Sequence, residues 1–312
     1  MSSANSQDNQ LPRLAAIDVG TNSIRLVVAQ LESAGTYSNL DEEREMSRLG
    51  QGLTRTGRLA EGPMKSSLDA IGKMQAISAG FGVRELRGIA TSAVREAANG
   101  ASFCREAKRR FGVNIEVISA EEEARLAFRS ATRQFELNGH AASIVDIGGG
   151  SVEVVLAAGS AIDEIHSLPL GALRLTEQFC RTDPLRRRHW RQLKNRIDKV
   201  ILRQIGKPPF RADVMFGSGG TFSTLAEIAQ CEREGKTETV HGYELTRAEL
   251  DHLMDRLIAE PLEGRRRIPG LNPARADIIV AGAAVVARLA KTKESGGLSS
   301  TSAVSETACS YP

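Results

Sequence analysis

Two stretches of the chain, 128 residues apart, share one pattern: an apolar run, an aspartate, a glycine-containing turn and a second apolar run. Residues 17–29 read IDVGTNSIRLVVA, and residues 145–157 read VDIGGGSVEVVLA. This internal similarity, at about the length of one domain, predicts two domains of similar plan, each opening with strand, glycine turn and strand. The aligned pairs include Asp18 with Asp146, Gly20 with Gly148, and Ser23 with Ser151.

Elsewhere, segments with helical spacing of apolar residues alternate with short apolar segments, which is typical of an α/β fold. Helices are expected at 64–79, 185–205, 246–259 and 274–291, and strands at 86–91, 113–118, 161–168 and 213–216. Further helices are expected after Ser92, after Ser119 and after the turn at 217–221. Ser92 is a candidate N-cap, and Ser119 and Thr246 are each followed three residues later by glutamate, as in a capping box.

The composition narrows the class of protein. With 41% hydrophobic and 25% charged residues among 312, it is typical of a globular chain of two-domain size. Only 4% of residues are aromatic, which argues against base-stacking platforms for single-stranded nucleic acid. A net charge of +3 is too mild to indicate a polyanion partner without local clustering of charge. The apolar run at 278–290 is too short for a bilayer, the N-terminus lacks an apolar signal segment, and the four cysteines lack zinc or disulfide spacing. We therefore expect a cytoplasmic protein that binds neither nucleic acid nor membrane.

The two glycine turns are candidate phosphate-binding loops. Glycine allows backbone N–H groups to approach an anion closely, and a serine or threonine adds a hydroxyl donor. An aspartate at the end of the preceding strand would repel phosphate unless a divalent cation such as Mg²⁺ lies between them. Taken alone, each turn is more typical of a plain hairpin. As a pair, the turns could face each other across an interdomain cleft and grip one phosphate chain from both sides.

Charged residues near the expected helix starts allow a structural and a functional interpretation. Arg95 lies in the first turn of its helix, where it could serve a bound anion or pair with Glu96 or another nearby acid. The glutamates at 121–123 begin the next helix, where acids stabilise a helix N-terminus. Of these three, Glu123 could also orient and deprotonate an attacking water.

Three features of the second half of the chain also allow two interpretations each. Glu153 is either a metal or water ligand near the glycine loop or a solvated hairpin residue. The turn GSGGT at 217–221 either binds phosphate, with Gly219 as the contact, or permits close strand–helix packing. The expected helix at 185–205 carries eight Lys or Arg residues within 186–203 and a single acid, so it is either a track for a long polyanion or a solvated helix face.

Six segments, in chain order, resemble the exopolyphosphatase/guanosine pentaphosphate phosphohydrolase (Ppx/GppA) family: IDVGTNSIRLVVA, GIATSAVREAANG, VISAEEEARLAF, VDIGGGSVEVVLA, SLPLGALRLTEQF and FGSGGTFSTLAEI. The resemblance covers roughly residues 14–290. It implies a two-domain α/β fold of the actin-like ATPase (ribonuclease-H-like) superfamily, with the active site in the interdomain cleft. It also implies Mg²⁺-dependent release of terminal phosphate from inorganic polyphosphate, from guanosine pentaphosphate, or from both.

The resemblance also implies a role for individual residues. Glu123 matches the family's catalytic glutamate, and Arg95 and Glu153 are further catalytic candidates. The implied metal ligands are Asp18, Asp146 and Glu153. The implied phosphate-binding residues are Gly20, Thr21, Asn22, Ser23, Gly148, Gly149, Gly150 and Ser151.

The chain has no room for the extra C-terminal domains of longer members, so it resembles the short, two-domain type, which is compatible with a homodimer. Its ending, ESGGLSSTSAVSETACSYP, lacks the strand and the Gly-Leu-Arg-Glu-Gly-type ending of family members. We expect a disordered N-terminus at 1–13, domains at 14–128 and 129–294, and a loosely ordered tail at 295–312. The expected function is hydrolysis of terminal phosphate from polyphosphate. Guanosine pentaphosphate hydrolysis and non-catalytic sensing of phosphate polymers are the alternatives.

Overall fold

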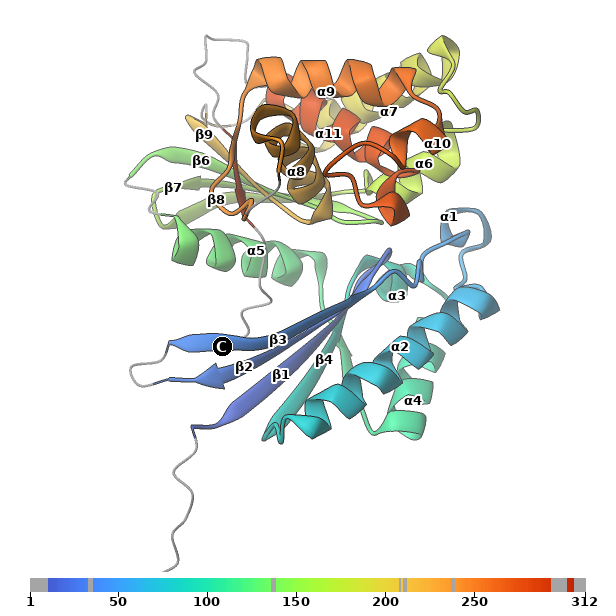
Figure 1. The fold of residues 1–312 in the computed structure, drawn as a ribbon, viewed down its shortest axis with the longest axis vertical. Helices are drawn as coiled ribbons and strands as arrows, with labels where there is room; N and C mark the ends of the chain where they lie inside the picture. Colours follow the sequence, from blue (N-terminus) through green and yellow to red (C-terminus); the bar gives the residue numbers. More distant parts are fainter. Residues whose placement is uncertain are drawn as a thin grey trace, which may run out of the picture.

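The chain folds into two α/β lobes, each built on one mixed sheet (Figure 1). This computed structural model describes residues 11–32, 36–135, 139–207, 209, 212–236, 239–292 and 302–305.

The first lobe has a five-stranded sheet in the order β3-β2-β1-β4-β5. Strand β1 pairs antiparallel with β2 and parallel with β4, so the first glycine turn joins two neighbouring strands. Helices α2 and α4 cover one face of this sheet and bury its main apolar core (Figure 1). The elements are β1 (Arg13–Val19), β2 (Ile24–Leu31), β3 (Tyr37–Glu45), α1 (Leu53–Thr56), α2 (Glu61–Gly80), β4 (Glu85–Ala90), α3 (Ser92–Glu96), α4 (Gly100–Phe111) and β5 (Ile115–Val117).

The second lobe has a six-stranded sheet in the order β10-β11-β9-β6-β7-β8. One face carries α5, and the other carries the remaining helices of this lobe (Figure 1). The strands are β6 (Ala141–Ile147), β7 (Val152–Ala158), β8 (Ala161–Leu168), β9 (Val214–Ser218), β10 (Glu244–Leu245) and β11 (Ser302–Ser305). The helices are α5 (Ala120–Gln134), α6 (Ala172–Phe179), α7 (Arg187–Gln204), α8 (Gly220–Glu234), α9 (Arg247–Ala259), α10 (Leu262–Arg265) and α11 (Ile279–Thr292), with a 3-10 turn at Pro273–Arg275.

The two sheets repeat one topology. Strands β6, β7, β8, β9 and β11 occupy the places of β1 to β5 in the same order, with the same parallel and antiparallel pairings. The register repeats as well, because Asp18 faces Arg25 across the first hairpin and Asp146 faces Glu153 across the second. The predicted α/β fold with two lobes of similar plan is confirmed.

The central strands of the second sheet are apolar on both faces because both faces are covered. In β6, Val145 and Ile147 join the core under the main helical layer, whereas Ile144 joins the core under α5. Period-two alternation between apolar and polar residues is therefore absent from this strand, as expected for a strand buried on both sides.

Helix α5 packs on the second sheet, although it precedes that sheet in the chain. Its residues Ala124, Ala127, Phe128 and Ala131 pack against strands β6, β7 and β9. The predicted boundary between residues 128 and 129 therefore falls inside a helix that is part of the second lobe's core. We propose to move the domain boundary to the short link between β5 and α5.

Both segments predicted to be loosely ordered or disordered contribute to a strand. Strand β1 begins at Arg13, inside the predicted disordered N-terminus, and residues 1–10 lie outside the described part of the chain. Residues Ser302–Ser305 form β11, which pairs parallel with β9 and antiparallel with β10. The prediction of a loose tail without the family's last strand is therefore wrong for these four residues, and the rest of the tail lies outside the described residues.

Most local predictions agree with the structure. The side chain of Ser119 caps α5 by accepting a hydrogen bond from the Glu122 amide, and Thr246 and Glu249 form a complete capping box at α9. Within the described ranges, the structure has no helix long and apolar enough to cross a bilayer.

Gly217 in β9 is a test of how the second lobe is packed. A Cβ atom at this position would lie 2.2–2.4 Å from ring carbons of Phe222 in α8, and Phe222 is itself fully buried. We expect Gly217→Ala to lower the free energy of unfolding by about 1–3 kcal/mol, measured by urea denaturation, because the buried ring has no free volume to enter.

Gly62→Ala in α2 is the matched control. No atom lies within 4 Å of a Cβ placed there. Because alanine has the higher helix propensity, this variant should be as stable as the wild type or more stable. Equal stability of the two variants would contradict the packing argument.

Candidate active site

The two glycine turns have the same backbone hydrogen bonding. In the first, the Gly20 amide donates to the Ser23 carbonyl at 3.0 Å, and in the second, the Gly148 amide donates to the Ser151 carbonyl at 3.1 Å. The repeat seen in the sequence therefore extends to the backbone of the loops.

The loop carbonyls are bound by neighbouring segments. In the second loop, the carbonyls of Gly148, Gly149 and Gly150 accept hydrogen bonds from the amides of Ala172, Arg174 and Gly171, at 3.0, 3.1 and 3.2 Å. These donors belong to the start of α6, so that helix end is already used by the loop.

The first loop is held in the same way. The carbonyls of Thr21 and Asn22 accept from the amides of Gly50 and Arg48, at 2.8 and 2.9 Å. Among the described residues, the amides at 21–23 and 149–151 have no hydrogen-bond partner. Because both loops line one cavity, these amides are available to an anion bound there.

Close approach of the two lobes is a second reason for glycine in the second loop. A Cβ atom on Gly149 would lie 3.0 Å from the Cβ of Asn22, and one on Gly150 would lie 2.4 Å from the Ser92 hydroxyl. Gly171, for which the sequence predicts no role, is equally crowded. A Cβ atom on this residue would lie 2.3 Å from the Gly150 backbone.

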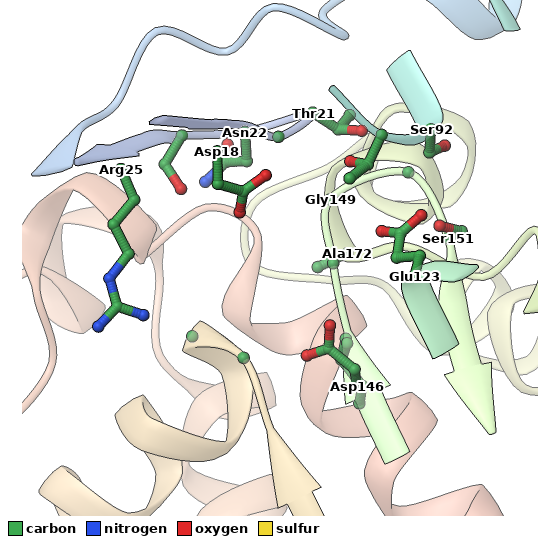
Figure 2. Close-up of a pocket in the computed structure, with 18 of the residues that line it drawn as sticks. Asp18, Thr21, Asn22, Arg25, Ser92, Glu123, Asp146, Gly149, Ser151 and Ala172 are labelled. Carbon is green, nitrogen blue, oxygen red and sulfur yellow. The ribbon is translucent and has the colours of Figure 1, made fainter. Parts of the chain in front are cut away.

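The cavity between the lobes has a volume of about 180 Å³. The carboxylates of Asp18, Glu123 and Asp146 lie around it (Figure 2). They come from three elements: Asp18 from β1, Asp146 from β6, and Glu123 from the first turn of α5. All eight residues of the two predicted phosphate loops also line it, as does Gly219.

Burial raises the pKa values of all three carboxylates, and neighbouring charges add to the shift of Asp18 and of Glu123. Burial raises the pKa of Asp18 to about 6, and the charge of Asp146 adds to this, while Arg25 and Arg44 oppose it. Burial also raises the pKa of Asp146, which the hydrogen bond from Ser218 opposes. The pKa of Glu123 is raised to about 7, mainly by burial; Arg95 lowers it, and the charges of Asp146 and Asp18 raise it. Carboxylic groups shifted this far are typical of functional sites.

Arg95 positions Glu123. Its Nη1 donates to Glu123 Oε2 at 3.0 Å and to the Ile118 carbonyl at 2.8 Å. Arg95 is absent from the described lining of the cavity. The geometry therefore favours the interpretation in which Arg95 pairs with an acidic side chain, not the one in which it contacts a bound anion. The partner is Glu123 rather than the neighbouring Glu96.

The prediction that Ser92 is an N-cap is wrong. Thr91 occupies the cap position of α3 without a capping hydrogen bond, and the Ser92 hydroxyl donates to Glu96 at 2.8 Å. Helix α3 is only five residues long, so capping signals have little weight there. Ser92 instead lines the cavity.

Glu153 lies behind the loop. It is 1% exposed, so the solvated-hairpin interpretation is wrong, and it is not among the described residues that line the cavity. Its Oε1 accepts from the Ser167 hydroxyl at 2.9 Å, and burial, followed by the charges of Glu123 and Asp146, raises its pKa well above the ordinary value. This places Glu153 beneath the site rather than in it.

Of the three predicted metal ligands, Asp18 and Asp146 line the cavity and Glu153 does not, so a divalent cation bound there could contact two of these carboxylates. In the described part of the chain, no three His, Cys, Asp or Glu side chains form a group able to hold a metal ion, so Asp18, Asp146 and Glu153 are not a preformed metal site. Asp18 Oδ1 is buried without a hydrogen-bond partner among the described residues, and Asp146 Oδ1 accepts from Ser218 at 2.9 Å. Two hard oxygen donors beside a phosphate cradle still fit Mg²⁺, which binds through few carboxylates and completes its shell with water and phosphate.

The turn GSGGT supports Asp146. Gly219 has a φ of +85°, and a Cβ there would lie 2.7 Å from Asp146 Oδ1. Gly217 permits strand–helix packing against Phe222, and Gly220 allows the guanidinium of Arg275 to approach closely. The packing interpretation is therefore correct for Gly217, whereas Gly219 lies at the cavity.

Three arginines at the cavity had no place in the predicted site: Arg25, Arg44 and Arg275. Burial and the nearby charge of Arg44 lower the pKa of Arg275 to about 10. Arg25 was visible only as the counterpart of Glu153 in the repeat. Arg44 and Arg275 lie outside every recognised motif, so no sequence signal indicated them.

Two further ion pairs, besides that of Arg95 with Glu123, join the lobes beside the cavity. Arg174 of α6 donates from Nε to the Gly150 carbonyl at 2.6 Å and from Nη2 to both oxygens of Glu96 at 2.7 and 2.6 Å. Arg48 pairs with both oxygens of Asp277 at 2.6 and 2.9 Å. The first pair ties the second glycine loop to α3, the helix that carries Arg95.

Known proteins share this architecture. The model of the Ppx/GppA phosphatase family matches residues 27–301. Exopolyphosphatase 2 of Mycobacterium tuberculosis is 31% identical, over 90% of this chain and 91% of its own length. The crystal structure of an exopolyphosphatase from Cytophaga hutchinsonii is 27% identical and covers 94% of each chain with a TM-score of 0.87. The Ppx/GppA family member of Aquifex aeolicus is 29% identical and covers 96% of this chain and 94% of its own, with a TM-score of 0.77.

Because the family match covers most of the chain, and because similar relatives cover nearly all of it, the chain belongs to the Ppx/GppA phosphatase family.

Proposed function

We propose that this chain is an exopolyphosphatase that hydrolyses the terminal phosphate of inorganic polyphosphate. The observation that carries the proposal is a glutamate with a pKa of about 7 at a cavity lined by two loops with free backbone amides. Such a pKa suits a general base near neutral pH. The curated relatives named as exopolyphosphatases support the choice of substrate.

In the proposed mechanism, the free amides of both loops hold the terminal phosphoryl group. Glu123 accepts a hydrogen bond from a water and takes its proton as the water oxygen attacks phosphorus. The bond to the bridging oxygen breaks on the opposite side, and the shortened chain leaves with its electron pair. Arg95 keeps the carboxylate of Glu123 directed at the water. Phosphoryl transfer depends mainly on such positioning and charge neutralisation.

We further propose that Mg²⁺ is the cofactor, held by Asp18 and Asp146. When bound, Mg²⁺ neutralises charge on the phosphates. Without a cation, the ionised forms of Asp18 and Asp146 are disfavoured by burial, and the charge of Asp146 also acts against ionisation of Asp18. A cytoplasmic location and a homodimer stay predictions from the sequence.

The first test is Glu123→Gln. We expect kcat on polyphosphate to fall about 10²- to 10⁴-fold, because the amide cannot accept the proton of the attacking water, while polyphosphate still binds. Phosphate release from polyphosphate, guanosine pentaphosphate and ATP should be measured side by side, with and without Mg²⁺.

Glu122→Gln is the control for this substitution, since Glu122 is exposed in the same helical turn. It should keep near-normal turnover. Near-normal turnover by Glu123→Gln would remove Glu123 as the base. Faster release from guanosine pentaphosphate would favour that substrate, and binding without any release by the wild type would favour a sensor.

The second test concerns the stability of the metal-free protein. A carboxyl whose pKa rises from 4.5 to about 7 on folding destabilises the fold as pH increases through that window. The penalty is absent below about pH 4.5 and complete above about pH 7. With EDTA present, Glu123→Gln should therefore raise Tm by a few degrees at pH 8 and by less at pH 5. A rise of the same size at both pH values, or one matched by Glu122→Gln, would show that ionisation of Glu123 is not the cause.

A further inference from the structure

The most basic part of the chain lies away from the cavity. Residues 181–203, which span the link after α6 and most of α7, contain nine Lys or Arg residues and two acids, while the whole chain has a net charge of only +3. The basic residues are Arg181, Arg186, Arg187, Arg188, Arg191, Lys194, Arg196, Lys199 and Arg203.

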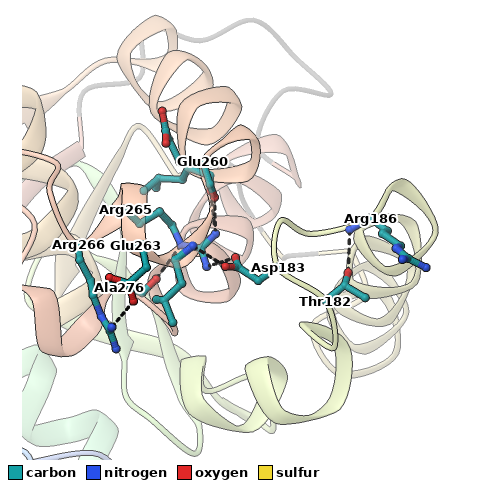
Figure 3. A network of polar contacts seen from close by, with 10 residues as sticks. Thr182, Asp183, Arg186, Glu260, Glu263, Arg265, Arg266 and Ala276 are labelled. Carbon is teal, nitrogen blue, oxygen red and sulfur yellow. Dashed lines mark hydrogen bonds and ion pairs between the residues drawn. The ribbon is translucent and has the colours of Figure 1, made fainter.

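Both acids of this segment are paired with arginines from outside it. Asp198 accepts from Arg288 of α11 at 2.5 and 2.7 Å. Asp183 accepts from Arg265 at 3.0 Å, and the nearly buried Arg265 side chain also donates to the carbonyls of Leu257, Glu260 and Ala276 (Figure 3). These carboxylates are therefore not available to offset the basic residues around them.

A surface hollow of about 500 Å³ lies within this segment. Its α7 side consists of Gln192, Asn195, Arg196 and Lys199, which share one helical face, and its other side includes Gln178 and Arg181. Arg181, Arg196 and Lys199 are exposed, and none of the three pairs with a carboxylate in the described part of the chain. Three cations and three amide side chains are donors suited to phosphate oxygens.

The hollow and the catalytic cavity lie at opposite ends of one helix. The first residues of α6 bind the second glycine loop, whereas Gln178 is near its C-terminal end. Eight helical residues span about 12 Å. Only a ligand with several phosphates can reach from one end to the other.

We propose that this hollow is an accessory binding site for phosphates of a long polyphosphate chain whose end lies in the cavity. The proposal rests on the proposed function, because it takes polyphosphate as the substrate. A polyphosphate chain has no bases to stack, which agrees with a surface rich in cations and amides and lined by a single aromatic residue, Phe179.

The test is the double variant Arg196→Ala/Lys199→Ala. Both residues are exposed, so the fold should be retained, which the Tm checks. We expect KM for long-chain polyphosphate to rise about tenfold or more, because two charged donors to phosphate are lost. Turnover at saturation, and both kcat and KM for tripolyphosphate, should be unchanged, since a short chain cannot reach the hollow.

Arg105→Ala/Lys108→Ala is the matched control, because it removes two exposed cations from α4 in the other lobe. An equal rise of KM in the control, or a rise of KM for tripolyphosphate as well, would show that the net charge of the protein causes the effect. Either result would contradict the proposed accessory site. An unchanged KM for long chains in the test variant would also overturn it.

Direct binding separates this proposal from the proposed function. If the wild type releases no phosphate from any polyphosphate, the proposed function fails, and the hollow is judged by binding of long-chain polyphosphate alone. Weaker binding by the α7 variant than by the α4 variant supports the hollow. If the wild type binds a DNA duplex as tightly as it binds long-chain polyphosphate at the same salt concentration, polyphosphate is not the specific ligand of the hollow.

Discussion

The burial of three carboxylates around one cavity is the constraint on which the rest of the site depends. Burial raises the pKa values of Asp18, Glu123 and Asp146, and neighbouring carboxylates add to the shift of Asp18 and of Glu123. Different groups offset each one: Arg95 pairs with Glu123, Ser218 donates to Asp146, and the charges of Arg25 and Arg44 oppose the shift of Asp18. Asp18 Oδ1 has no hydrogen-bond partner among the described residues. This arrangement suits the proposed roles, in which Asp18 and Asp146 hold a cation and Glu123 takes a proton.

The position of Glu123 shows how the two lobes share one site. Its helix, α5, follows the last strand of the first sheet but packs on the second, so Glu123 belongs to the second lobe while its partner Arg95 belongs to the first. Arg174 reinforces this connection by holding the Gly150 carbonyl and Glu96, the residue next to Arg95. The orientation of the proposed base therefore depends on how the lobes are joined, and contacts between the lobes are part of the proposed catalytic geometry.

Charge is used in two opposite ways in this molecule. Inside the cavity, acids and arginines lie close together and shift one another's pKa values. In residues 181–203 most of the basic residues are exposed, and the two acids are paired with Arg265 and Arg288 from other elements. The first arrangement suits chemistry at one phosphate group, and the second suits weak, extended contact with a polyanion.

The sequence by itself determined the two-lobed α/β plan, because a repeat of strand, glycine turn and strand leaves few other topologies. Short motifs also located both loops, Asp18, Asp146 and Glu123, because the backbone conformation of a turn or a helix start depends on the residue types that are adjacent in the sequence. It did not locate the cap of α3, the true place of α5, the burial of Glu153 or the strand at Ser302–Ser305. Nor did it indicate Arg44 and Arg275, which line the cavity from segments far apart in the chain, and it gave no role to Arg174, although this residue lies in one of the six quoted segments. Only the tertiary structure decided these, because burial, charge pairing and contact between lobes depend on residues that no local pattern connects.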